Sequence, residues 1–147
     1  MLLLAIDGTR RDDAGNPATR GAASLTFNID NQLTAYNGTA VTCGYRADGL
    51  RAWKQVGATR TYYLYDGTAP LCEMNSAGSI TAVTTFGANG LLSRRVGAAD
   101  THYAFDPSGN VANYVTSPTT ASHTGFDAFG QRYGASYTDP FGYQAQW

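Results

Sequence analysis

The sequence predicts an all-β protein in which consecutive antiparallel hairpins form one curved sheet that could roll partway into a barrel. Three observations predict this fold class. A short phrase of aromatic residues followed by aspartate recurs along the chain, and glycine-containing turn pairs separate β-prone segments. No segment shows a sustained helical period of apolar residues. The 147 residues fit one domain, 1–147, without a linker long enough to divide it.

The composition supports this fold class and argues against several functions. Charged residues make up 14% of the chain, well below the roughly 25% of ordinary globular proteins. Ten basic and eleven acidic residues give a net charge of -1, which argues against nucleic-acid binding. No segment approaches the roughly 18 apolar residues of a membrane span. The apolar residues 1–6 lack a basic flank, so we interpret them as a buried first strand rather than a signal peptide.

The recurring phrase is an aromatic residue, any residue, an aromatic or aliphatic residue, then aspartate and a turn of small residues. It is clearest at Tyr63-Leu64-Tyr65-Asp66-Gly67 and at Tyr103-Ala104-Phe105-Asp106-Pro107. The aspartate-equivalent positions 12, 30, 48, 66, 87, 106 and 127 are 18, 18, 18, 21, 19 and 21 residues apart, with Gly87 in place of one aspartate. A period of about 20 residues holds two strands and two turns, so the unit is a β-hairpin and the chain holds about six to seven repeats. The residues assigned to the structural repeat are Asp30, Asp48, Tyr63, Tyr65, Asp66, Tyr103, Phe105, Asp106, Gly109, Phe126 and Asp127.

The physical chemistry of a strand explains the phrase. Alternate side chains share a face, so Tyr63 and Tyr65 point one way while Leu64 points the other. Large residues on both faces predict a sheet that is covered on both sides. An aspartate at the strand end can accept hydrogen bonds from turn amides. The pairs Asn37-Gly38, Asp48-Gly49 and Asp66-Gly67 predict two-residue hairpin turns, and residues 33–47 read as one complete hairpin.

These residues carry a family resemblance. The Tyr-x-Tyr-Asp phrase, the stretch Phe27-Asn28-Ile29-Asp30-Asn31 and the closing stretch Asp139-Pro140-Phe141-Gly142-Tyr143 resemble the tyrosine-aspartate (YD) repeats of rearrangement-hotspot (RHS) proteins. That family includes the teneurins and the C-components of bacterial toxin complexes. The resemblance covers nearly the whole chain and implies a repeat protein whose β-sheet strip spirals into a hollow shell.

The resemblance also implies a function. An RHS shell encloses or presents a C-terminal toxin in bacterial competition, so the implied partners are neighbouring RHS repeats and a toxin cargo. The implied location is secreted or cell-surface, as part of a larger protein. In the family, a core-associated region with an Asp-Pro-x-Gly-Leu self-cleavage motif follows the repeats. Here Tyr143 stands where leucine is expected, so self-cleavage is not carried over, and we interpret the chain as a shell fragment that ends just before that region.

No enzymatic role, cofactor or metal site is expected. The only histidines, His102 and His123, lie in strand-like surroundings without a motif that would make either a general base. The recurring aspartates are explained by the turns of the repeat. Asp12-Asp13-Ala14-Gly15-Asn16 brings several oxygen atoms together but lacks the EF-hand pattern, so a plain turn is favoured. Cys43 and Cys72 could form a disulfide, although two buried thiols are the favoured interpretation.

Two alternatives remain open. Aromatic side chains can stack on sugar rings, and glycan binding has been attributed to YD repeats, so the chain could be a carbohydrate-binding or cell-surface-binding module. The candidate stacking residues are Trp53, Tyr114, Tyr133 and Trp147. The second alternative is an interaction surface, because the end strands of a cut strip expose edges that can pair with another chain and cause self-association.

Overall fold

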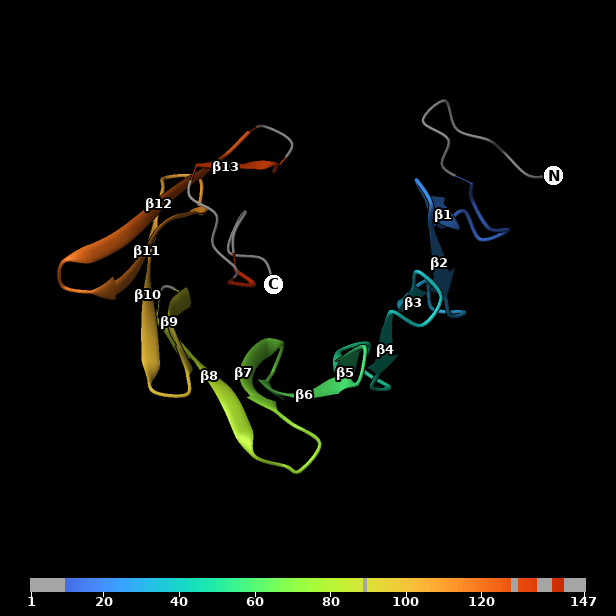
Figure 1. Ribbon diagram of the computed structural model, residues 1–147, viewed down its shortest axis with the longest axis horizontal. Coiled ribbons are helices and arrows are strands. Elements are labelled where there is room, and N and C mark those ends of the chain that lie inside the picture. Colours follow the sequence, from blue (N-terminus) through green and yellow to red (C-terminus); the bar gives the residue numbers. More distant parts are fainter. Residues whose placement is uncertain (1–9, 89, 128–129, 135–138, 142–147) are drawn as a thin grey trace. The chain divides into compact units, whose positions relative to one another are not determined.

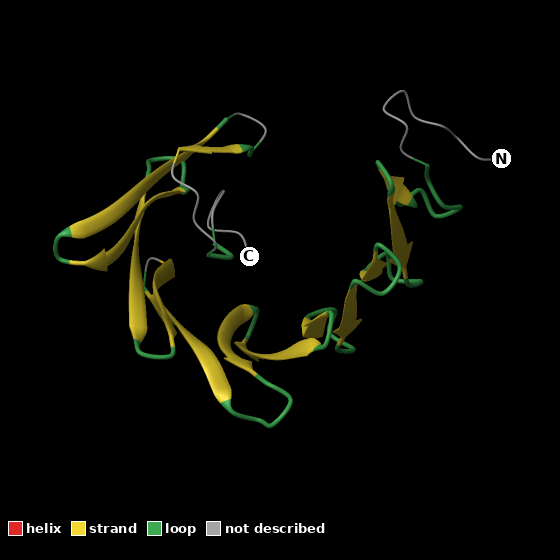
Figure 2. Ribbon diagram, viewed as in Figure 1, coloured by secondary structure: helices red, strands yellow, loops and turns green. Residues whose placement is uncertain are grey.

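The protein is all-β, as the sequence predicts. The computed structural model describes residues 10–88, 90–127, 130–134 and 139–141, and every regular element among them is a strand (Figure 2). The chain divides into two compact units, Met1–Ile80 (unit 1) and Thr81–Trp147 (unit 2). The prediction of one domain over residues 1–147 stays a prediction. The expected first strand at residues 1–6 lies outside the described residues.

Within each unit the strands follow one another in chain order, and each described pair is antiparallel (Figure 1). The strands of unit 1 are β1 (Thr19–Arg20), β2 (Ala23–Phe27), β3 (Leu33–Tyr36), β4 (Val41–Tyr45), β5 (Arg51–Val56), β6 (Thr59–Asp66) and β7 (Ala69–Met74). The strands of unit 2 are β8 (Ile80–Gly87, of which Ile80 is the last residue of unit 1), β9 (Gly90–Val96), β10 (Ala99–Phe105), β11 (Val111–Ser117), β12 (Thr120–Phe126) and β13 (Arg132–Gly134). The architecture is therefore a series of hairpins in which each strand pairs with its neighbours in the sequence.

The predicted hairpin of residues 33–47 is confirmed by the pairing of β3 with β4. Its turn contains Asn37 and Gly38 with φ of 49° and 68°, left-handed values that asparagine and glycine tolerate. The turn spans the four residues between Tyr36 and Val41, which are paired, and is longer than the two-residue turn that the sequence predicts. At Asp66 the prediction is closer, since Asp66 pairs with Ala69 across a two-residue turn.

A β-bulge marks the aromatic residue of the repeat. In five hairpins the pairing register shifts immediately before an aromatic residue near the end of the strand. These aromatic residues are Phe27, Tyr45, Tyr65, Phe86 and Phe105. A bulge adds a residue to the partner strand and increases the local twist. The repeat is thus visible in the backbone as well as in the sequence.

The aspartates of the repeat do not all occupy the same turn position. In the turn 106–110, Oδ1 of Asp106 accepts hydrogen bonds from the backbone N–H groups of Ser108 and Asn110, both at 2.9 Å. In the turn 28–32 it is Asn28 that accepts the equivalent bonds, one of them from the N–H of Asp30 at 3.1 Å. Asp30 therefore lies two residues beyond the position of Asp106, because an asparagine supplies the acceptor.

Asp48 is displaced in the same way. The turn 46–50 begins at Arg46, whose N–H donates to the carbonyl of Leu50 at 2.8 Å, so Asp48 is the third residue of this turn. Its carboxylate accepts from the Leu50 N–H at 3.2 Å and pairs with Arg46 at 2.6 Å. In the copies at Asp30 and Asp48 the turn therefore starts two residues before the aspartate. The Asp48-Gly49 pair does not form a two-residue turn.

The most deeply buried side chains of each unit lie on one face of its sheet. The buried face, here called the tyrosine face, carries Tyr63 in unit 1, where burial and the neighbouring Glu73 carboxylate raise the pKa of Tyr63 to about 12. In unit 2 this face carries the core cluster of Leu91, Tyr103, Val111, Tyr114 and Phe141. On the opposite face Leu64 and Leu92 are 48% and 52% exposed. The expectation of a sheet covered on both sides is therefore wrong at these positions of the described chain, because about half of each leucine is open to solvent.

Two glycines in the strands are shielded by an aromatic side chain on the facing strand. Gly44 pairs with Trp53, and a Cβ on Gly44 would overlap the indole ring. Gly125 pairs with Tyr133, whose ring atoms would lie 2.6 Å from an added Cβ. An aromatic ring that lies over a strand glycine replaces the packing which the missing side chain cannot provide. These pairs fix where Trp53 and Tyr133 point.

Candidate functional site

The most elaborate side-chain arrangement among the described residues is the docking site of residues 139–141 on the tyrosine face of unit 2. Phe141 is only 2% exposed, although it belongs to no strand. Its ring contacts Tyr103 edge to face, with centroids 5.7 Å apart and an interplanar angle of 70°. Tyr103 makes a similar contact with Tyr114 at 5.9 Å. A short segment outside the sheet thus completes the core of unit 2.

Two polar side chains bind the backbone carbonyl of Phe141. The Tyr114 hydroxyl donates to it at 2.7 Å, and Nη2 of Arg132 donates at 3.4 Å. The Arg132 guanidinium also lies 5.8 Å from the centroid of the Tyr114 ring, within the range of a cation–π contact. Since Tyr114 is fully buried, an unpaired hydroxyl there would be costly, and the Phe141 carbonyl satisfies it.

Asp139 is bound on the same face. Its Oδ2 accepts a hydrogen bond from the Tyr103 hydroxyl at 2.8 Å and lies 3.9 Å from Nη1 of Arg94. Its Oδ1 accepts from the N–H of Phe141 at 3.0 Å. The Asp139 side chain is 4% exposed and that of Arg94 is 13% exposed. A buried carboxylate is tolerated only when charge and hydrogen bonds compensate its lost hydration, and all three partners do so here.

The strand alternation of β10 and β11 positions this site. Tyr103 and Tyr114 are directly opposite each other, so their rings share a face and lie close together. Val111 pairs with Phe105 across the bulge and is fully buried, which provides an apolar floor beside the rings. The site therefore combines an apolar hollow, a guanidinium beside a carboxylate, and donors aimed at one backbone carbonyl.

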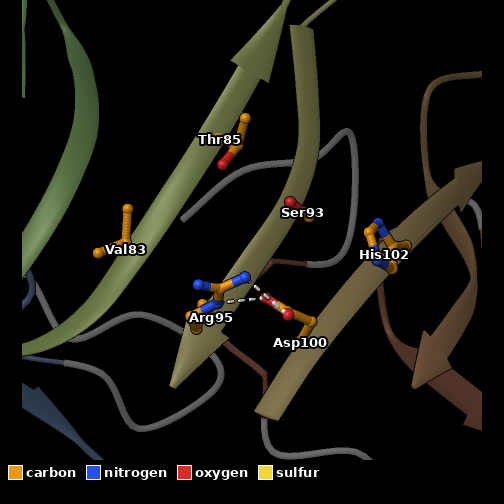
Figure 3. A pocket seen from close by; sticks show the side chains of 6 residues that line it. All are labelled: Val83, Thr85, Ser93, Arg95, Asp100 and His102. Atoms are coloured by element: carbon orange, nitrogen blue, oxygen red, sulfur yellow. Dashed lines mark hydrogen bonds and ion pairs between the residues drawn. The ribbon is translucent and has the colours of Figure 1, made fainter. Parts of the chain in front are cut away.

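A shallow depression of about 280 Å³ lies on the opposite face of unit 2 (Figure 3). It is lined by Val83, Thr85, Ser93, Arg95, Asp100 and His102. Nε and Nη2 of Arg95 donate to the two carboxylate oxygens of Asp100 at 2.8 and 3.0 Å. This hydrogen bonding lowers the pKa of Asp100 and raises that of Arg95. Both oxygens of the Asp100 carboxylate are bound by Arg95, and among the described residues no hydrogen bond joins this carboxylate to His102.

A second hollow, of about 340 Å³, shares Asp100 and His102 with this depression and is otherwise lined by Val115, Thr116, Ser117 and Pro118. The other histidine, His123, lies on β12 with its Nδ1 3.3 Å from Oδ1 of Asn113. Strand pairing places His102 opposite Val115 and His123 opposite Asn113. The two histidines are thus parts of strand surfaces.

Within the described ranges, no group of three or more histidine, cysteine, aspartate or glutamate side chains could hold a metal ion. Oδ1 of Asp12 accepts hydrogen bonds from the N–H groups of Ala14 and Asn16 at 3.0 and 2.8 Å, so it serves its own turn. Cys43 and Cys72 are free thiols; Cys43 is buried, and Cys72 pairs with Leu64 on the open face. The described part of the chain contains no helix that is long and apolar enough to cross a membrane.

The four candidate sugar-stacking residues have different surroundings. Tyr114 is fully buried, so it cannot stack on a ligand, and the alternation of β11 explains this burial. Trp53 is half-buried, and the Arg60 guanidinium lies 4.1 Å from its ring centroid. Tyr133 is 62% exposed, and Trp147 lies outside the described residues. Trp53 belongs to unit 1 and Tyr133 to unit 2.

The sequence signalled part of this docking site. Asp139-Pro140-Phe141 is motif-like and Tyr103 belongs to the repeat phrase, whereas Arg94 and Arg132 lie outside that phrase and carry no signal. No protein-family model matches the chain, and no curated protein is similar enough to count as a relative.

Proposed function

We propose that the chain is a structural wall segment of a β-shell of the RHS type, and that its tyrosine face lines enclosed polypeptide. The observation that carries this proposal is the burial of the Asp139 and Phe141 side chains, which belong to a segment outside the strands, on the tyrosine face of unit 2. The sheet binds this segment through side chains and not through strand pairing. The lining of a shell requires this kind of binding, because it must contact enclosed polypeptide that is not part of the sheet.

The internal construction of the hairpins supports a wall role. Each strand pairs with its sequence neighbours, so further hairpins can be added at the ends without changing those already present. Tyrosine hydroxyls link neighbouring strands: Tyr45 on β4 donates to the carbonyl of Leu33 on β3 at 2.8 Å, and Tyr65 on β6 donates to the carbonyl of Arg51 on β5 at 3.0 Å. Repeated links of this kind stiffen a strip without a large core.

The remainder of the proposal comes from the resemblance to YD repeats. The enclosed polypeptide would be a toxin, the neighbours would be further RHS repeats, and the setting would be secretion in bacterial competition. The chain itself would have no catalytic role. Arg95 and Asp100 support a structural interpretation of the depression, since their side chains neutralise each other.

The test is to isolate the natural polypeptide that contains this sequence with an antibody against residues 99–126 and to image it by electron cryomicroscopy. The proposal expects the hairpins to form part of the wall of a hollow body, with residues 139–141 and additional polypeptide on the tyrosine face, inside that wall. Hairpins that project into solvent on both faces, with no enclosed chain, would refute a wall role.

A further inference from the structure

We propose that the tyrosine face of unit 2 is a peptide-binding site for an aspartate–proline–phenylalanine segment, and that it binds residues 139–141 of a second copy of the chain when its own segment is withdrawn. This inference goes beyond the wall role and does not depend on it. It rests on the contacts of the segment that occupies the site within the same chain.

The site recognises three chemically different features of the segment. A carboxylate is bound by the Tyr103 hydroxyl and the Arg94 guanidinium, at 2.8 and 3.9 Å. An aromatic ring fills the hollow beside Leu91 and Val111. A backbone carbonyl accepts from the Tyr114 hydroxyl at 2.7 Å. A peptide that lacks any one of these features leaves a buried polar group unpaired or a hollow unfilled, and this makes the site selective.

The segment has the character of a preorganised ligand. Oδ1 of Asp139 accepts from the N–H of Phe141 at 3.0 Å, which closes a local turn around the intervening proline. Proline fixes its own φ, so little backbone freedom is lost on binding. Pro140 is exposed, so the site needs it for shape and not for contact. The recognised element is short enough to be presented by a peptide.

The attachment is of a kind that can be exchanged between copies. Side chains of the face donate hydrogen bonds to the Asp139 carboxylate and the Phe141 carbonyl, and among the described residues no strand pairing joins the segment to the sheet. In the intact chain the tether gives the segment a high effective concentration, on the order of millimolar for a short flexible link. A second copy therefore competes only when the site's own segment is weakened.

The experiment uses the full chain with Phe141→Ala, which empties the ring hollow and leaves the face intact. The probe is a fluorescein-labelled peptide with the sequence of residues 138–142, Thr-Asp-Pro-Phe-Gly, and its polarisation is measured against protein concentration. We expect saturable binding with a dissociation constant below about 1 mM. A peptide with asparagine in place of aspartate is expected to bind about tenfold or more weakly, because it loses a charge-assisted hydrogen bond.

The second-copy arm mixes that variant with a chain carrying both Tyr114→Phe and Arg132→Ala, which weakens its own grip on the Phe141 carbonyl. Analytical ultracentrifugation is expected to show a one-to-one complex of the two variants, while each alone remains monomeric. Peptide binding without this complex would overturn the second-copy part of the proposal.

A chain with Asp139→Asn, which keeps the Phe141 ring, serves as the second recipient if the Phe141→Ala chain does not fold. Folding is checked by far-ultraviolet circular dichroism before each titration. Equal binding of the aspartate and asparagine peptides would overturn the assigned selectivity. The absence of saturable binding in every folded recipient up to about 1 mM peptide would overturn the whole proposal.

Discussion

The hydroxyl of Tyr114 donates a 2.7 Å hydrogen bond to the carbonyl oxygen of Phe141, 27 residues further along the chain. Both side chains are buried, at 0% and 2% exposed. The Tyr114 hydroxyl on the strand and the Phe141 carbonyl outside the sheet therefore satisfy each other's hydrogen-bonding capacity. Either group would be costly to bury in the apolar interior without a partner. This contact links the repeat architecture to the proposed lining role.

Replacement of Tyr114 by phenylalanine tests the value of this hydrogen bond. Tyr114→Phe removes the donor and leaves the ring in place, so the free energy of unfolding is expected to fall by about 1–3 kcal/mol. The matched control is Tyr133→Phe, which removes an exposed hydroxyl and is expected to change stability by less than about 0.5 kcal/mol. Urea unfolding measures both, and equal effects of the two variants would show that the Tyr114 hydroxyl is not buried against Phe141.

The tyrosine hydroxyls that link neighbouring strands should contribute measurably to stability. Tyr45→Phe deletes the hydrogen bond to the Leu33 carbonyl, and Tyr65→Phe deletes the hydrogen bond to the Arg51 carbonyl. Each is expected to cost about 0.5–1.5 kcal/mol of unfolding free energy. The control is Tyr36→Phe, whose hydroxyl makes no hydrogen bond to the described residues. If Tyr36→Phe lowers the free energy of unfolding by as much, the loss comes from changed solvation of the ring and not from the hydrogen bonds of Tyr45 and Tyr65.

The Gly44–Trp53 pair predicts a strong coupling between two substitutions. Gly44→Ala places a Cβ against the indole and is expected to destabilise unit 1 by about 1–3 kcal/mol. In a Trp53→Ala background the same change is expected to be neutral or stabilising, since alanine restricts the unfolded chain more than glycine. A double-mutant cycle in urea measures this, and a coupling below about 0.5 kcal/mol would contradict the close packing.

The turn at Asp106 should make stability depend on pH. The Asn110 side chain and the Asn110 and Ser108 N–H groups hold the pKa of Asp106 below its usual value. A lowered folded-state pKa gives stability that is present above the unfolded pKa of about 3.9 and is lost as the pH falls through the folded value. The stability difference between the wild type and Asp106→Asn is therefore expected to be constant above about pH 5 and to shrink below about pH 4. A difference that stays constant down to pH 2 would show that Asp106 does not titrate with the turn.

Much of the fold follows from local rules that a sequence exposes. The aromatic and turn pattern predicted consecutive antiparallel hairpins, and the pairing of β3 with β4 confirms one of them at the predicted place. The residue at which each turn begins could not be predicted in this way. Asn28 and Asp106 accept the same set of turn hydrogen bonds, so a search that follows aspartate alone selects Asp30 instead.

The candidate site was harder to predict because it depends on contacts between residues far apart in the sequence. Alternation identified Tyr103 as part of a stripe, but which stripe becomes buried depends on the segment that covers it. Tyr114 was interpreted as a candidate for sugar stacking, although it is fully buried beneath Phe141. Arg94 joins the site only through its position on β9, a tertiary fact that no local pattern contains.

The most direct test of the account is a nuclear Overhauser spectrum of the intact chain, recorded for the ring protons of Phe141. The account predicts cross-peaks from this ring to the rings of Tyr103 and Tyr114, together with chemical shifts displaced by the two tyrosine rings. Phe141 protons at random-coil shifts, without cross-peaks to either tyrosine, would contradict the claim that the tyrosine face holds a passing segment.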